Sequence, residues 1–90
     1  MQKVIFSNKF TKEYILMVKR GKDIKKMKLV VEILANKTPL PAKYKDHKLT
    51  GNYQGSRELD LEPDWLLIYK IAGNSITLER TGTHSDLFKN

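Results

Sequence analysis

Two histidines, His47 and His84, are the side chains of this sequence best suited to move protons near neutral pH, because an unperturbed imidazole titrates there. Two carboxylates, Asp60 and Asp64, lie between them in the chain. A carboxylate beside a histidine can orient the ring and hold its imidazolium form. This set of residues suits RNA cleavage by the 2′-hydroxyl, which needs a base, an acid and positive charge on the phosphate.

The other groups that such a reaction requires are also present. An arginine within a strand can bind two phosphate oxygens at once, and a flat aromatic ring can support an unstacked base. Loop and strand-end positions on a rigid scaffold are where catalytic groups are often found. The candidate catalytic residues are His47, Asp60, Asp64 and His84, and the candidate RNA-binding residues are Arg57, Trp65, Arg80 and Phe88.

Ordinary structural roles compete with each of these interpretations. A loop histidine is more often solvated than catalytic, and Trp65, which opens an apolar strand, is more often part of the core. Asp64 follows a proline and is a common turn residue. Arg57 and Glu58 can be surface charges on a strand. Arg80 can pair with Glu58 or Glu79, and Phe88 can simply cover the sheet edge. Taken singly, none of these residues establishes an enzyme.

Several familiar catalytic motifs are absent from the sequence. It contains no phosphate-binding glycine loop, no HExxH and no nucleophile elbow. A metal site could be assembled from the two histidines with Asp60 or Asp64, but their spacing does not favour one. We therefore predict neither a metal nor another cofactor.

Two amphipathic helices are predicted in the first half of the chain. Gly21 suits the end of the first helix, Asp23 can cap the second, and Asn36 ends it before two prolines. The short connection predicts an antiparallel helical hairpin. The two apolar stripes at helical spacing consist of Phe10, Tyr14, Met17 and Val18, and of Ile24, Met27, Val31 and Leu34.

Strands are predicted before and after the two helices. A short strand over residues 3–7 opens the chain, and a polar connection over residues 40–55 leads into three further strands. The middle one is almost continuously apolar, as expected of a central strand covered on both faces. Short turns make the last three strands antiparallel, so the sequence predicts an α+β fold of one domain over residues 1–90, in the order β-α-α-β-β-β. The last three strands span residues 57–61, 65–71 and 76–83.

The charge of the chain is strongly uneven. Its net charge is +7, with a sequence pI of about 9.7. Residues 1–48 hold 13 Lys/Arg and 4 Asp/Glu, whereas residues 49–90 hold 4 and 6. A basic half favours a polyanionic partner such as nucleic acid, although solubility alone also explains surplus lysine.

There are no cysteines, no long apolar run and no signal-peptide pattern, so we expect a cytoplasmic protein.

Three sequence runs together resemble a known family. LPAKYKDHKLTGNYQGSREL, LEPDWLLIYKI and ERTGTHSDLF closely resemble the YafQ-type toxins of the RelE/ParE toxin–antitoxin superfamily. The resemblance is strong over about residues 40–88 and weaker over the helices. It implies a RelE-like fold, with two N-terminal helices packed on a curved, mainly antiparallel sheet. It also implies ribosome-dependent cleavage of messenger RNA in the A site, and a DinJ/RelB-type antitoxin that blocks the active cleft and helps repress the operon.

The family's motifs imply roles for particular residues. His47 matches the histidine of the DH-x-L motif, as a candidate general base or part of a base–acid pair. His84 matches the histidine of the GTH motif, as a candidate general acid. Asp64 and Trp65 match the PDW motif, where the carboxylate would orient a histidine or contact RNA and the indole would shape the cleft or stack. Phe88 matches the C-terminal aromatic near the active site.

Arg57 and Arg80 match strand arginines suited to phosphate contacts. The sequence departs from the family at Asp60, because YafQ-type toxins usually carry a histidine there. A carboxylate at this position can serve as the base, raise the pKa of a neighbouring histidine, or weaken activity by adding negative charge near a phosphate. We therefore expect retained but altered activity.

Two other functions remain open at this point. ParE toxins share the fold and inhibit DNA gyrase by binding, which requires neither histidine. A non-catalytic module that binds RNA or the ribosome would need only the lysine-rich helices, and its binding would fall steeply with salt.

Overall fold

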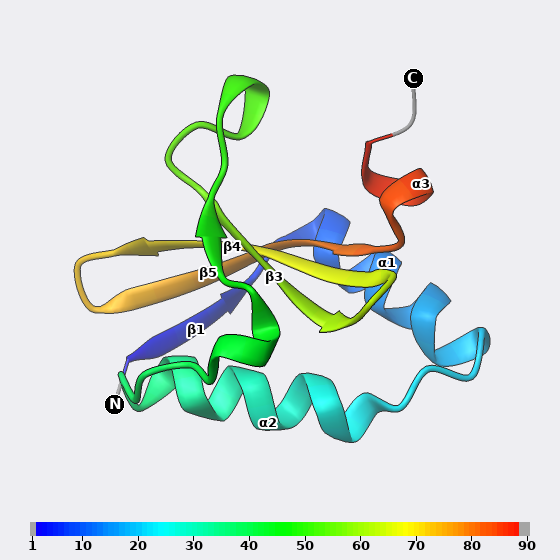
Figure 1. Ribbon diagram of the computed structural model, residues 1–90, viewed down its shortest axis with the longest axis horizontal. Coiled ribbons are helices and arrows are strands. Elements are labelled where there is room, and N and C mark those ends of the chain that lie inside the picture. Colours follow the sequence, from blue (N-terminus) through cyan, green and yellow to red (C-terminus); the bar gives the residue numbers. More distant parts are fainter. Residues whose placement is uncertain (1, 89–90) are drawn as a thin grey trace.

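Residues 2–88 are described by a computed structural model, which contains a five-stranded sheet with two helices on one face (Figure 1). The predicted α+β class and the order of the predicted elements are confirmed, and four short elements that were not predicted, η1, β2, η2 and α3, are added. In chain order the elements are β1 (Lys3–Phe6), α1 (Asn8–Lys19), α2 (Ile24–Ala35), the 3-10 helix η1 (Ala42–Tyr44), β2 (His47–Lys48), the 3-10 helix η2 (Gly51–Tyr53), β3 (Arg57–Glu62), β4 (Trp65–Ala72), β5 (Ser75–Gly82) and α3 (His84–Leu87).

The sheet has the strand order β1-β5-β4-β3-β2. β1 runs parallel to β5, and every other neighbouring pair is antiparallel. The predicted central strand is confirmed, because β4 lies in the middle and its residues 65–69 are buried. Both faces of β4 are covered: α2 lies on one side of the sheet, while α3 and the segment over residues 49–56 lie on the other (Figure 1).

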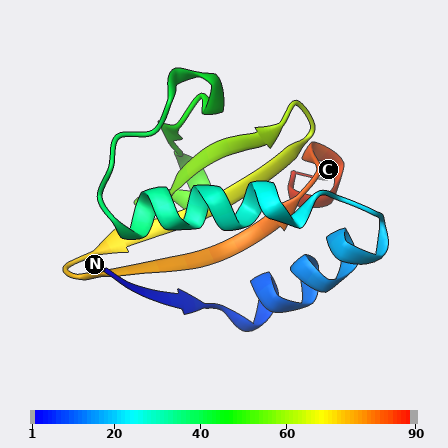
Figure 2. The ribbon, with the colours of Figure 1, turned by 90° about the horizontal axis from the view of Figure 1, so that it is seen from below.

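The helix ends follow the predicted capping chemistry. Ser7 caps α1 by accepting a hydrogen bond from the backbone N–H of Phe10 at 2.9 Å, and Asp23 caps α2 through the N–H of Lys25 at 3.1 Å. Gly21 has a φ of 84°, the left-handed conformation that glycine adopts without steric cost. The short link therefore turns the chain back across the sheet (Figure 2).

The buried stripes of the helices differ in part from the prediction. Val18 is 44% exposed and Ile24 is 37% exposed, so their assignment to the core was wrong. Val30, which was not predicted, is fully buried. The reason is that the two helices lie apart from each other and leave an apolar groove, so only the residues that face the sheet are covered. The groove is lined by Phe6, Phe10, Thr11, Tyr14, Met27, Lys28, Val31, Glu32 and Leu78.

The hydrophobic core is divided by the sheet into two parts. The larger cluster lies under the helices and includes Trp65, Leu67 and Tyr69 of β4. A smaller cluster lies on the other side, where Leu66 and Ile68 are covered by α3 and the η2 segment. We call this second side, which α1 and α2 do not cover, the open face. Within residues 2–88, no helix has the length and apolar character needed to span a membrane.

Candidate active site on the open face of the sheet

The register of the strands places several of the candidate residues on the open face. His47 on β2 lies opposite Glu58 on β3, Glu58 lies opposite Ile68 on β4, and Ile68 lies opposite Arg80 on β5. Residues directly opposite each other on neighbouring strands share a face of the sheet. His47, Glu58 and Arg80 therefore line one row across the open face. His47 was expected in a loop, and the structure instead places it on a two-residue strand.

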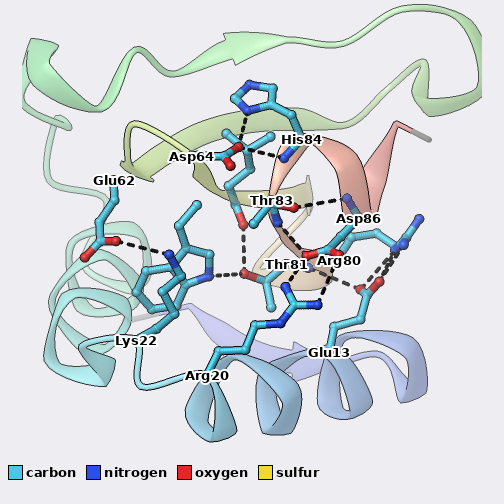
Figure 3. Close-up of polar contacts among 12 residues, drawn as sticks. Glu13, Arg20, Lys22, Glu62, Asp64, Arg80, Thr81, Thr83, His84 and Asp86 are labelled. Atoms are coloured by element: carbon cyan, nitrogen blue, oxygen red, sulfur yellow. Dashed lines mark hydrogen bonds and ion pairs between the residues drawn. The ribbon is translucent and has the colours of Figure 1, made fainter. Parts of the chain in front are cut away.

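His84 and Asp64 form the most exposed pair of this surface (Figure 3). Oδ1 of Asp64 accepts a hydrogen bond from the backbone N–H of His84 at 2.9 Å and lies 2.7 Å from Nδ1 of the ring. Because a carboxylate can only accept, Nδ1 carries a proton, and Nε2 faces no protein partner within residues 2–88. The Asp64 carboxylate raises the pKa of His84, and the backbone and ring N–H groups of His84 lower the pKa of Asp64.

The turn that carries His84 is held by a capping box. Thr83 accepts a hydrogen bond from the N–H of Asp86 at 3.1 Å, and the Asp86 carboxylate accepts from the N–H of Thr83 at 2.9 Å. Arg20, which directly follows α1, forms an ion pair with Asp86 at 2.7 Å, and this contact helps to lower the pKa of Asp86 to about 2. A Cβ atom at Gly82 would lie 2.9 Å from Cβ of Asp86, which explains the glycine of the GTH motif. His84 therefore projects from a rigid turn.

His47 and Glu58 form a second histidine–carboxylate pair, which is more buried. Nδ1 of His47 lies 2.7 Å from the carbonyl oxygen of Lys45, and Nε2 lies 3.3 Å from Oε1 of Glu58. Glu58 is only 6% exposed, and its Oε2 is the one buried side-chain oxygen or nitrogen among residues 2–88 without a hydrogen-bond partner. Burial raises the pKa of Glu58, although the nearby His47 and His84 oppose this effect. The Glu58 carboxylate can therefore orient the ring of His47 from a largely buried position.

Asp60 extends the same surface along β3. It lies opposite Leu66, whose side chain belongs to the small cluster on the open face, and it is partly exposed. Its negative charge contributes to the raised pKa of both Glu58 and His84. The structure thus places Asp60 near both histidine–carboxylate pairs, in contact with neither.

Arg80 is on the open face but is already occupied by a protein carboxylate. Glu13 of α1 accepts hydrogen bonds from Nε of Arg80 at 2.9 Å and from Nη2, and it also accepts from the backbone N–H of Thr81 at 3.2 Å (Figure 3). Nη1 of Arg80 donates to the hydroxyl of Tyr53 at 2.6 Å. The expected pairing of Arg80 with Glu58 or Glu79 is wrong, because Glu13 of α1 supplies the carboxylate instead.

The structure places two of the predicted RNA-binding residues away from the open face. Arg57 lies opposite Tyr69, on the helix side of the sheet, where it pairs with Asp46 at 2.7 Å. It is therefore separated by the sheet from the candidate residues on the open face. Trp65 is fully buried, and its Nε1 donates to the hydroxyl of Thr81 at 2.9 Å, so no RNA base can stack on it. Its role is to fix the start of β4, directly after Asp64.

Phe88 and Tyr53 supply an aromatic surface beside His84. Their ring centroids are 6.1 Å apart, with planes at 84°. Phe88 is 40% exposed and Tyr53 is partly buried. Phe88 follows His84 by one helical turn, since its N–H donates to the His84 carbonyl at 2.8 Å. The structure thus brings this predicted aromatic to the same corner of the molecule as the His84 pair.

Three residues of the site were missed by the sequence reasoning. Glu58 was interpreted as a surface charge. It lies two residues before Asp60 on the same strand, so it could have been placed on the same face of the sheet. Glu13 is the only acidic residue of α1, and Tyr53 lies in the polar connection among glycines. Neither of these two carries a local signal for its contact with Arg80, which depends on tertiary packing.

No metal centre is formed by the residues of this surface. Within residues 2–88, no three histidine or carboxylate side chains are grouped so that they could hold a metal ion. The site consists instead of two histidine–carboxylate pairs on an exposed face of a small basic α+β domain. This arrangement defines a class of protein equipped for acid–base chemistry on an anionic substrate.

Comparison with known proteins places the chain in a family. Residues 2–89 match the family described as "Bacterial toxin of type II toxin-antitoxin system, YafQ". The "mRNA interferase toxin YafQ" of Escherichia coli K12 is 48% identical over 84 residues, which are 92% of this chain and 91% of the relative. The chain belongs to the YafQ family of toxins of type II toxin–antitoxin systems.

Solved structures of relatives confirm the fold. The crystal structure of the Escherichia coli DinJ–YafQ complex contains a chain that is 44% identical, with a TM-score of 0.89 over 98% of this chain and 99% of that one. The crystal structure of a metal-bound toxin from Helicobacter pylori is also 44% identical, with a TM-score of 0.91 over 98% and 100%.

Proposed function

We propose that this protein is an mRNA interferase, an endoribonuclease that cleaves messenger RNA in the ribosomal A site. The observation that carries the proposal is the presence of two histidine–carboxylate pairs, His84 with Asp64 and His47 with Glu58, on one exposed face. Membership of the YafQ family and the 48% identity to a protein named mRNA interferase support the choice of substrate.

The proposed reaction requires two proton transfers. A base removes the proton from a ribose 2′-hydroxyl, the 2′-oxygen attacks the adjacent phosphorus, and the bond from phosphorus to the 5′-oxygen breaks. An acid then delivers a proton to that 5′-oxygen. The products are a 2′,3′-cyclic phosphate, which can hydrolyse to a 3′-phosphate, and a 5′-hydroxyl. His47 and His84 are the proposed proton carriers, and each is oriented by its own carboxylate.

The two histidines are presented differently to a substrate. His84 has Nδ1 on Asp64 and Nε2 without a partner within residues 2–88, so Nε2 is the atom proposed to exchange a proton with RNA. His47 has contacts at both ring nitrogens, so a substrate must displace the contact with Glu58 before Nε2 can exchange a proton with RNA. A base and an acid that act in the same reaction predict a bell-shaped dependence of cleavage on pH.

Asp60 is proposed to modify this chemistry. Its charge adds to the negative field of Glu58 and favours the imidazolium form of His84. A phosphate that approaches the same surface meets this charge as a repulsion. An Asp60→His variant should therefore cleave at a different rate and with a shifted pH profile. If both the rate and the profile stay as in the wild type, Asp60 has no role in catalysis.

Positive charge for RNA binding is proposed to come from the helices, since Arg57 lies behind the sheet and Arg80 is paired with Glu13. Exposed lysines on α1 and α2 provide a field that attracts the ribosome and its RNA. The reaction is proposed to be independent of metal ions. Protein that has been treated with EDTA and then freed of it should cleave at the untreated rate in a translation system that contains the magnesium the ribosome needs. Added zinc or copper should not change that rate.

We also propose that a DinJ/RelB-type antitoxin is the physiological partner. The family is defined as the toxin half of type II toxin–antitoxin systems, and a relative has been crystallised with DinJ. Such a partner would cover the open face and would contact operator DNA on behalf of the complex. Co-expression with a cognate antitoxin should suppress the cleavage activity that the isolated chain shows.

Primer extension on a defined messenger in a purified translation system tests the proposal. Wild-type protein and an Asn74→Ala control, which alters the exposed β4–β5 hairpin, should cut at A-site codons only when ribosomes are present. His84→Ala and His47→Ala should not cut, although urea unfolding should show that both variants are folded at the assay temperature. If both histidine variants cut normally, the proton-transfer roles are wrong. If wild type cuts nothing but causes gyrase-dependent DNA breaks, the protein acts by gyrase inhibition.

A further inference from the structure

His47 is carried by a strand that is too short to fix it. β2 contains only His47 and Lys48, which lie opposite Glu58 and Arg57 of β3. It is the edge strand of the sheet, so within residues 2–88 it pairs with β3 alone. The segment before it is the 3-10 helix η1, which ends at Lys45 with a φ of 51°. Contacts outside the strand pairing are therefore needed to fix where His47 lies.

Asp46, which directly precedes His47, is held on the helix side of the sheet. Its Oδ2 accepts hydrogen bonds from Nε of Arg57 at 3.1 Å and from Nη2 at 2.7 Å, and its Oδ1 accepts one from the hydroxyl of Tyr69. Tyr69 is 1% exposed, so the packing of β4 fixes its hydroxyl. Burial, together with the Asp46 carboxylate, raises the pKa of Tyr69, so the hydroxyl stays a donor at neutral pH. Both carboxylate oxygens of Asp46 are thus anchored to neighbouring strands of the sheet.

The anchored peptide also supplies one contact of the His47 ring. The carbonyl oxygen that lies 2.7 Å from Nδ1 of His47 belongs to the peptide bond between Lys45 and Asp46. Because a carbonyl oxygen can only accept, this contact places the ring proton on Nδ1. Nε2, which lies 3.3 Å from Oε1 of Glu58, is then the nitrogen that gains and loses a proton. A peptide that is fixed at Asp46 therefore sets both the position of the ring and its tautomer.

We propose that Asp46 is a positioning residue for His47, and that Arg57 and Tyr69 act with it by holding its carboxylate behind the sheet. The proposal deepens the proposed function and rests on it for the role of His47 in proton transfer. Arg57 then serves the site through Asp46, from the face opposite to the RNA. A misplacement of about 1 Å in a catalytic group can cost about 100-fold in rate, even when the substitution lies away from the reacting atoms. Loss of the anchor should therefore lower kcat and leave KM nearly unchanged.

The tautomer of His47 tests the proposal without any substrate. In isotope-labelled protein, at a pH where both imidazoles are neutral, two-bond proton–nitrogen NMR spectra show which ring nitrogen carries the proton. Wild type should carry it on Nδ1 of His47, and also on Nδ1 of His84, which contacts Asp64. Asp46→Asn should move the His47 proton toward Nε2, the tautomer that an unconstrained ring prefers in water. His84 should not change, so it is an internal reference in the same spectrum.

Cleavage kinetics on programmed ribosomes supply the second readout. Asp46→Asn should lower kcat by about 10- to 100-fold and should change KM by less than about twofold. Glu32→Gln is the matched control, because it also replaces a carboxylate by an amide, at an exposed position of α2. This control should keep the wild-type kcat and the wild-type His47 tautomer.

Milder substitutions keep the test independent of the folding of Asp46→Asn. Tyr69→Phe removes only the hydroxyl and should lower kcat less than Asp46→Asn does. Arg57→Lys keeps the charge but not the paired donors of the guanidinium, so its kcat should lie between those of wild type and Arg57→Gln. Because both residues act through Asp46, adding Tyr69→Phe to Asp46→Asn should lower kcat little further. Urea unfolding identifies the variants that are folded at the assay temperature. If Asp46→Asn is not among them, Tyr69→Phe and Arg57→Gln decide the question by the same two readouts.

The outcomes separate this proposal from the proposed function. The positioning role is overturned if the wild-type ring carries its proton on Nε2, or if folded Asp46→Asn keeps the wild-type tautomer and kcat. A rise in KM that exceeds the loss of kcat also overturns it. If wild type cleaves messenger RNA in any of these cases, the proposed function stands without it. If the tautomer changes as expected but wild type does not cleave, Asp46 positions the ring and the proposed reaction is wrong.

Discussion

Replacing Thr81 by valine tests how the two ends of the His84 site are joined. Thr81 is fully buried, and its hydroxyl accepts a hydrogen bond from Nε1 of Trp65 at 2.9 Å and donates to the carbonyl of Leu66 at 2.7 Å (Figure 3). Asp64 immediately precedes Trp65, so this bridge ties the strand ends that carry Asp64 and His84. Thr81→Val keeps nearly the same shape and removes both hydrogen bonds.

The cost follows from the groups that valine leaves unpaired. A buried donor without a partner costs about 1–3 kcal/mol, and the indole N–H of Trp65 loses its acceptor. The Leu66 carbonyl has a second lone pair and contributes less. We therefore expect Thr81→Val to lower the free energy of unfolding by about 1–3 kcal/mol. For a domain of this size the melting temperature should fall by roughly 4–8 °C for each kcal/mol.

Urea unfolding measured by fluorescence is the direct assay, because Trp65 is the only tryptophan of the chain. Thr81→Ser is the matched control: it keeps the hydroxyl and loses one buried methyl group, at a cost of about 0.8 kcal/mol. Thr81→Val should also cleave RNA more slowly at temperatures where it is fully folded, since the strand ends are less well fixed. A valine variant as stable as wild type, or a serine variant that loses more stability than the valine variant, would refute the reasoning.

Three other substitutions test separate parts of the site. Asp64 raises the pKa of His84, so the stability from this pair is complete below the unfolded-state pKa and is lost as pH rises through the folded-state pKa. In Asp64→Asn, NMR should therefore show His84 titrating at lower pH. Burial raises the pKa of Glu58, so this carboxyl costs stability as pH rises. Glu58→Gln should consequently gain stability relative to wild type between acidic and neutral pH, as measured by urea unfolding, and a parallel pH dependence of the two proteins would contradict this. Gly82→Ala places a Cβ 2.9 Å from Cβ of Asp86 and should destabilise the protein by about 1–3 kcal/mol; an unchanged midpoint in thermal unfolding would show that the turn relaxes freely.

The local elements of the fold are largely encoded in the sequence. The apolar run over residues 65–71 predicted a central strand, and the structure places it between β3 and β5. Asp23 and Gly21 predicted the link between the helices, because capping and positive φ depend on short-range chemistry. His84 and Asp64 were also identified, because each belongs to a short motif at a strand end.

The sequence could not determine which residues face each other across the sheet. Alternation with a period of two shows that Glu58 and Asp60 share a face, but not which face it is, nor that His47 is the neighbour of Glu58. That pairing depends on the register of β2, a strand of only two residues. Trp65 and Arg57 were assigned to RNA for the same reason: the types of the residues fit, whereas their sides of the sheet were unknown.

Contacts between distant segments were decided by tertiary structure alone. Glu13 lies 67 residues before Arg80, and nothing in the local pattern of α1 distinguishes its carboxylate from a solvated one. The contact arises because α1 packs beside β5, where the ion pair is shielded from solvent. The hydroxyl of Tyr53 accepts a hydrogen bond from Nη1 of Arg80, which Glu13 does not contact. Sequence patterns determine the elements and their apolar faces, because these depend on neighbouring residues. The packing of those elements decides which charges meet, because the free energy of a pair depends on its burial and its distance.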